Sequence, residues 1–163
     1  MALDLIERAI FLRRTVIGRE LPDAALRLIA EVAREASFDA GSVIAYEGDV
    51  GQEMFLVVSG WGEIRKLGAP PPERARGDAL GIVVGTFERD AVLGEMAVLD
   101  DERRSASIVA DSAVVALVVH REDLRDAIGA CPDLAFGLFR VLAARIRVAD
   151  AQRIAAQARG GSP

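Results

Sequence analysis

Metal ligands and disulfide partners are scarce in this sequence. Its 163 residues include one cysteine, Cys131, and one histidine, His120. A single cysteine cannot form a disulfide within the chain, and one cysteine with one histidine cannot complete a zinc site. Neither residue has a catalytic partner nearby in the sequence. We therefore expect no stapled secreted fold, no metal site, no cofactor and no catalytic residue.

Long apolar runs and an excess of positive charge are missing as well. No stretch approaches the length of a membrane span, and the N-terminus carries Asp4 and Glu7, so we expect neither a span nor a signal peptide. The formal net charge of −5 gives no overall attraction for nucleic acid or anionic lipid. The hydrophobic share of 52% is enough to bury a core. These features predict a folded, cytoplasmic protein.

Hydrophobic spacing divides the chain into three parts. Apolar residues at intervals of three and four predict helices over residues 3–36 and again from Arg121 onward. Between them lie short β-rich runs separated by glycines, which predict about eight strands in a barrel or roll. Three consecutive prolines predict a loop over residues 68–79. The predicted units are a helical segment (1–37), a β-domain (38–120), C-terminal helices (121–158) and a flexible tail (159–163).

Residues that can bind a sugar phosphate are concentrated between positions 92 and 107. Gly94 permits a tight turn, and the following residues can form one helical turn whose free N–H groups attract an anion. Arg104 supplies a planar, charged fork suited to phosphate, and Ser105 adds a hydroxyl. Glu95 can accept hydrogen bonds from sugar hydroxyls but repels a bare phosphate. The combination favours a sugar phosphate and is compatible with a nucleotide.

Two separated motifs resemble a known family. Residues 92–107 resemble the phosphate-binding cassette of cyclic nucleotide-binding domains, F-G-E-[LI]-A-L-L-x(4)-R-[AST]-A-[ST], with Arg104 at the family's offset from Gly94. Residues 38–60 resemble the first half of the family's β-roll. The resemblance implies a mainly β fold with flanking α-helices: an eight-stranded antiparallel β-roll (a jelly roll) with N-terminal helices and C-terminal B and C helices.

The resemblance also implies a role for each cassette residue. Arg104 would pair with the oxygens of a cyclic phosphodiester, and Glu95 would accept from the ribose 2′-OH. The other implied ligand contacts come from the backbone or the pocket edge, at Gly94, Met96, Ala97, Ser105 and Ala106. The implied function is a cyclic nucleotide-binding sensor, not an enzyme. Its ligand would draw the cassette inward, and the C-terminal helix would close over the base.

Departures from the family pattern leave alternatives open. Leu93 stands where the family often has Phe, and Arg103 where many members have Pro, so a slip of one residue would exchange Arg103 and Arg104. Ser105 is compatible with cyclic AMP, which we favour, and with cyclic GMP. Glu95 and Arg104 could instead pair with each other in a roll that binds no nucleotide and serves as a scaffold or interaction module.

Basic residues dominate the C-terminal helix, which contains Arg140, Arg145, Arg147, Arg153 and Arg159 with Asp150 as the acid among them. We expect this helix to contact an effector protein or a second copy of the chain. Nucleic acid is not an expected partner, because the sequence ends before the DNA-binding helices that the family's transcription factors append. Candidates for capping the purine are Ile146, Arg147 and Ile154.

Overall fold

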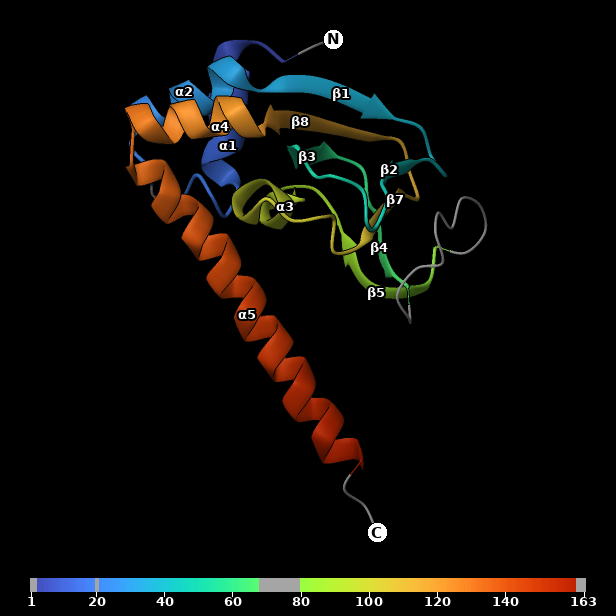
Figure 1. Cartoon of the computed structure of the whole chain (residues 1–163). Helices are drawn as coiled ribbons and strands as arrows, with labels where there is room; N and C mark the ends of the chain where they lie inside the picture. Colours follow the sequence, from blue (N-terminus) through green and yellow to red (C-terminus); the bar gives the residue numbers. More distant parts are fainter. Residues whose placement is uncertain (1–2, 20, 68–79, 161–163) are drawn as a thin grey trace.

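Two antiparallel β-sheets flanked by helices make up the molecule (Figure 1). The computed structural model describes residues 3–19, 21–67 and 80–160. The loop predicted over 68–79 and residues 161–163 of the predicted tail lie outside these residues. Within the described ranges there are eight strands, each sheet having four. The predicted fold, a mainly β roll with flanking helices, is therefore confirmed.

The N-terminal helices α1 (Leu5–Arg14) and α2 (Asp23–Val32) each begin at a recognisable residue. Asp4 caps α1 in a capping box, accepting from the Glu7 amide at 2.8 Å while the Glu7 carboxylate accepts from the Asp4 amide at 2.9 Å. Pro22, which has no N–H, precedes the first residue of α2. The helical prediction fails at its end, because residues 34–38 form a strand. Their partner strand lies about 80 residues away, so local spacing could not reveal the pairing.

The first sheet joins strands that are distant in sequence. Its order is β1-β8-β3-β6, with bounds Arg34–Phe38, Val114–His120, Glu53–Ser59 and Val92–Leu93. The second sheet has the order β2-β7-β4-β5, with bounds Val43–Ala45, Ser107–Ala110, Gly62–Lys66 and Ile82–Phe87. Every pairing is antiparallel. The cassette segment thus enters from β6 in one sheet and leaves into β7 in the other.

Two clusters of buried side chains hold the fold together. One lies between the helices and the outer side of the first sheet, and includes Leu26, Leu117 and Leu138. The other fills the roll and includes Phe55, Phe87 and Ile108. Because successive residues of a strand face opposite sides, β3 and β8 contribute to both clusters. These two strands therefore connect the interior of the roll with the helices packed on its outer side.

Three helices follow β6. The short helix α3 (Glu95–Asp100) precedes β7, α4 (Arg121–Ala130) follows β8 directly, and α5 (Asp133–Gly160) completes the described chain. The start of α5 is packed through Leu134 and Leu138, whereas residues 146–157 are exposed. Figure 1 shows α5 extending away from the roll, and its last turn includes residues predicted as tail. None of the described helices has the length and apolar character needed to cross a membrane.

Candidate functional site

The turn between β6 and α3 depends on Gly94. This residue has a φ of +76°, in the left-handed region that side chains rarely adopt. A Cβ atom added here would collide with the guanidinium of Arg104 and would lie 3.1 Å from the carbonyl oxygen of Glu53. Glycine therefore lets the chain turn into α3 and lets Arg104 lie directly against the backbone of that turn.

Arg104 is held in the pocket wall by its backbone and its ring contact. Its amide donates to the carbonyl of Asp49 at 2.8 Å, and its carbonyl accepts from the Gly48 amide at 2.9 Å. The residue is only 7% exposed, and its guanidinium lies over the Phe55 ring, 5.4 Å from the centroid. Nη1 donates to the Gly94 carbonyl at 3.2 Å. The guanidinium has five N–H donors, so donors other than this one can bind an anion.

Arg104 is buried beside several acids. Burial lowers the pKa of its guanidinium, and attraction to Glu53, Asp49 and Glu95 opposes that change. An arginine remains protonated in spite of such a shift. The neighbouring Arg103 is exposed and donates from Nη1 to the carbonyl of Gly48 at 2.7 Å. Of the two registers left open by the sequence, the structure thus places Arg104 at the pocket and Arg103 outside it.

Glu95, the first residue of α3, is almost completely buried, with 1% of its surface exposed. Its partner is Arg145 from α5: Nε lies 2.6 Å from Oε1, and Nη2 donates to Oε2 at 3.1 Å. Arg145 also donates to the carbonyl of Val92 at 2.6 Å. The carboxylate therefore pairs with Arg145 and not with Arg104, unlike the pairing considered from the sequence.

The charge on Glu95 is balanced between two opposing effects. Burial raises the pKa of its carboxyl group, while Arg145, its own backbone N–H and Arg104 lower it, and the net direction is upward. The carboxylate is consequently a strong acceptor with little water around it. A hydroxyl donor that reaches Glu95 would therefore have little water to displace from the carboxylate.

All seven predicted site residues line one cavity. The lining joins the β6–α3 turn to the strand that follows it, and the residues are Gly94, Glu95, Met96, Ala97, Arg104, Ser105 and Ala106. Ile64, Leu93, Ile108 and Arg145 complete the wall. The cavity volume is about 50 Å³, small beside the roughly 300–1,000 Å³ of typical ligand sites. Arg145, which comes from α5, forms part of the wall of this narrow pocket.

Arg145 is the residue that sequence analysis missed, since it was noted only as part of a basic helix. A signal was present in the spacing. Leu134, Leu138 and Val141 recur at the intervals of one helix face and are buried, and Arg145 is the next position in that series. A charged residue on an otherwise apolar face needs a buried partner, which here is Glu95.

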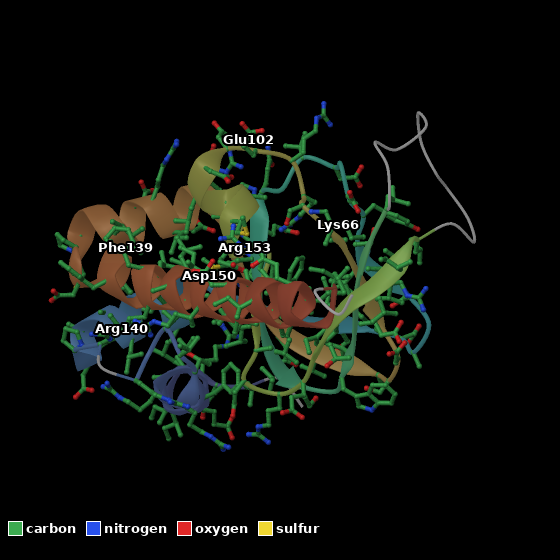
Figure 2. All side chains as sticks on the ribbon, turned by 90° about the horizontal axis from the view of Figure 1, so that it is seen from below. Lys66, Glu102, Phe139, Arg140, Asp150 and Arg153 are labelled. Carbon is green, nitrogen blue, oxygen red and sulfur yellow. The ribbon has the colours of Figure 1, made fainter. Side chains whose placement is uncertain are left out.

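Three residues proposed to cap a purine do not line the cavity in this structure. Ile146 and Ile154 are 63% and 66% exposed, and Arg147 is exposed as well. Figure 2 views the molecule from below and shows α5 crossing in front of the roll, with Asp150 and Arg153 labelled on its distal half. The sequence candidates for the base therefore remain predictions.

Similar sequences agree on one family. The family model described as "Cyclic nucleotide-binding domain" matches residues 35–130. A cyclic AMP receptor protein of Thermus thermophilus is 35% identical over 113 residues, which cover 69% of this chain and 49% of that protein. A cAMP-dependent protein kinase regulatory subunit of Aspergillus niger is 32% identical over 106 residues, covering 65% of this chain and 23% of its own length. The chain thus spans about half or less of these relatives.

Solved structures show the same fold. The crystal structure of the Thermus thermophilus catabolite activator protein superposes with a TM-score of 0.73 at 28% identity, covering 88% of this chain and 63% of that one. A domain from Methylobacillus flagellatus superposes with a TM-score of 0.74 at 19% identity, covering 91% and 83%, and supports the fold alone. With the family model matching more than half of the residues, the chain belongs to the cyclic nucleotide-binding domain family.

Proposed function

We propose that this chain binds a cyclic mononucleotide in the cavity beside α3, with cyclic AMP favoured, and acts as a regulatory sensor rather than an enzyme. The observation that carries the proposal is the meeting of buried Glu95 and buried Arg104 in one cavity. The relatives described as a cyclic AMP receptor and a cAMP-dependent kinase regulatory subunit support this choice of ligand. A cytoplasmic location is part of the same proposal.

Each charged group has a distinct task in the proposed complex. The guanidinium of Arg104 pairs with the phosphodiester oxygens, and the carboxylate of Glu95 accepts from the ribose 2′-OH. A hydrogen bond to a charged partner contributes about 1.5–3 kcal/mol. Gly94, Met96 and Ala97 offer backbone contacts, and Ser105 and Ala106 border the same cavity. Because Arg104 recognises an anionic group and Glu95 recognises a hydroxyl close to it, the site favours a nucleotide over free phosphate.

A response to the ligand follows from the narrowness of the cavity. The Glu95–Arg145 pair occupies the side at which the ribose is proposed to lie, so the nucleotide must shift Arg145 and with it α5. Residues 141–158 then close over the base as a lid. Only a difference in nucleotide affinity between the two positions of α5 can drive this change.

Isothermal titration of nucleotide-free protein with cyclic AMP and with cyclic GMP tests the proposal. We expect saturable binding with a micromolar or tighter Kd, about −8 kcal/mol, to the wild-type chain. Arg104→Ala should abolish it, while Arg103→Ala, a matched control at the exposed neighbour, should leave it nearly unchanged. Equal loss in both variants, or equal binding in both, would contradict the assignment of Arg104.

The second candidate function is a ligand-free scaffold or interaction module. It is favoured by the contact between Glu95 and Arg145, which gives the buried carboxylate a counter-charge without a nucleotide. A folded wild-type protein that gives no heat with either nucleotide would support this alternative. A saturable titration that depends on Arg104 would exclude it.

The partner that we propose for α5 is a second copy of this chain or an effector protein. Fifteen helical residues, 146–160, extend from the body, and Ile146 and Ile154 lie exposed among them. An isolated helix of about this length is marginal in water, so a partner is expected to stabilise it. Sedimentation equilibrium should detect a dimer that Ile146→Glu weakens and Gln152→Glu, an exposed control, does not. A monomer in all three proteins would favour an effector.

A further inference from the structure

Arg121, the first residue of α4, contacts two other segments of the chain, the loop before β3 and the helix α3 with its cap. Its side chain is 11% exposed, although arginine is normally a surface residue. Nη2 donates to the carbonyl of Gly51 at 2.7 Å and to the carbonyl of Ala97, and Nη1 pairs with the carboxylate of Asp101. Its backbone N–H donates to Gln52 at 2.7 Å. One guanidinium thus joins α4, the loop before β3 and α3.

The contact with α3 lies at the end of the helix opposite to Glu95. Asp101 is the C-terminal cap of α3 and adopts a φ of +64°, so the helix ends there. The last carbonyls of a helix lack partners within it and carry partial negative charge. Arg121 supplies a positive donor at this point, while Glu95 and Arg145 meet at the other end. Arg121 is absent from the cavity lining described above.

The segment around Gly51 is also part of the surroundings of Arg104. A Cβ atom on Gly51 would collide with the Cβ of Ala97 and would approach Nε of Arg104 to 3.1 Å. No side chain larger than hydrogen fits between them without displacement. Through Gly51 and Ala97, Arg121 therefore holds the two backbone segments that pack against the proposed phosphate-binding arginine.

We propose that Arg121 is a positioning residue that couples α3 and the Gly51 segment to α4, so that a ligand which displaces α3 also displaces α4. The proposal rests on the proposed function, because the ligand of the cavity supplies the displacement. The coupling requires the fork of arginine: three acceptors from two segments surround one group, and a lysine ammonium cannot reproduce that planar arrangement.

Hydrogen exchange of the full chain, with and without saturating cyclic AMP, tests this coupling. The measured quantity is the nucleotide-dependent change in exchange for peptides of α3 (95–100), α4 (121–130) and the packed half of α5 (133–145). The variants are Arg121→Ala and Arg121→Lys, and Arg125→Ala is the matched control, an exposed arginine on the same helix. Calorimetry on the same proteins gives the Kd.

We expect both wild type and Arg125→Ala to show the change in α3 and in α4. In Arg121→Ala the α3 change should persist and the Kd should move by less than about fivefold, while the α4 change should fall by about fivefold or more. The α5 change should remain, because Arg145 links α5 to Glu95 separately. Arg121→Lys should also lose most of the α4 change, and it carries the test if the alanine variant does not fold.

Two results would overturn the proposal while leaving nucleotide binding intact. One is a full α4 change in either Arg121 variant, which would make the residue merely structural. The other is a wild-type protein that binds the nucleotide without any change in α4. A wild-type protein that binds neither cyclic AMP nor cyclic GMP is a separate outcome: it refutes the proposed function, and the coupling proposal with it.

Discussion

The two ends of α3 are each held by an arginine from the C-terminal helices, but under different conditions. At the first end, Arg145 pairs with the buried carboxylate of Glu95 inside the cavity, so a ligand must compete with it. At the last end, Arg121, which is itself absent from the cavity lining, binds Asp101 and the backbone carbonyls of Ala97 and Gly51. We therefore expect a bound ligand to replace the contact between Arg145 and Glu95. We expect the contacts of Arg121 to persist when the ligand binds.

The largest effect is expected on stability, from removing Arg145, the partner of Glu95. Arg145→Ala leaves the buried carboxylate of Glu95 without its counter-charge, and breaking a buried pair in this way can cost several kcal/mol. Because Arg145 is 40% exposed, we discount this to about 1–2 kcal/mol of unfolding free energy. Urea denaturation measures the loss, with Arg147→Ala, an exposed position two residues away, as the control. Equal stability of the two variants would mean that the pair contributes nothing.

The next effect concerns the proposed ribose contact. Glu95→Gln should weaken cyclic AMP binding by about tenfold, since the hydrogen bond to a charged acceptor becomes a neutral one. The same substitution should change the affinity for 2′-deoxy cyclic AMP much less, because that ligand has no 2′-OH to donate. Calorimetry of the four combinations isolates the contact. A tenfold loss for both ligands would place the role of Glu95 elsewhere.

The dependence on pH follows from the raised pKa of Glu95. Because burial disfavours the charged form in the folded state, ionisation of this group costs stability as the pH rises through its folded pKa, and the cost is absent below the unfolded value. Nucleotide binding has the opposite sign, since the ribose contact needs the carboxylate. We expect affinity to fall on acidification through the raised pKa and Glu95→Gln to flatten that fall. An unchanged slope in the variant would assign the titration to another group.

The smallest effect is expected at the edge of the cavity. Ser105 is exposed, so deleting its hydroxyl removes a contact that competes with water. Ser105→Ala should change the Kd for cyclic AMP by less than about fivefold. Calorimetry of the variant beside wild type measures the change. A loss as large as that of Glu95→Gln would move Ser105 from the edge to the centre of the site.

The parts of the site that were predictable lie close together in sequence. Gly94, Glu95 and Arg104 fall within eleven residues, where a motif can be recognised, and they line one cavity. The arginines that hold α3 could not be found in this way, because Arg145 meets Glu95 across 50 residues and Arg121 meets Gly51 across 70. Most of strand β1 was missed for the same reason, since it pairs with β8 and its residues 34–36 were predicted as helix.

A crystal structure of the complex with cyclic AMP tests the central claim most directly. The account predicts that the cyclic phosphate lies within hydrogen-bond distance of the Arg104 guanidinium and that the ribose 2′-OH donates to Glu95. It also predicts that Arg145 has moved from its present contact with Glu95. A nucleotide bound away from this cavity, or one bound here with neither Arg104 nor Glu95 in contact, would contradict the account.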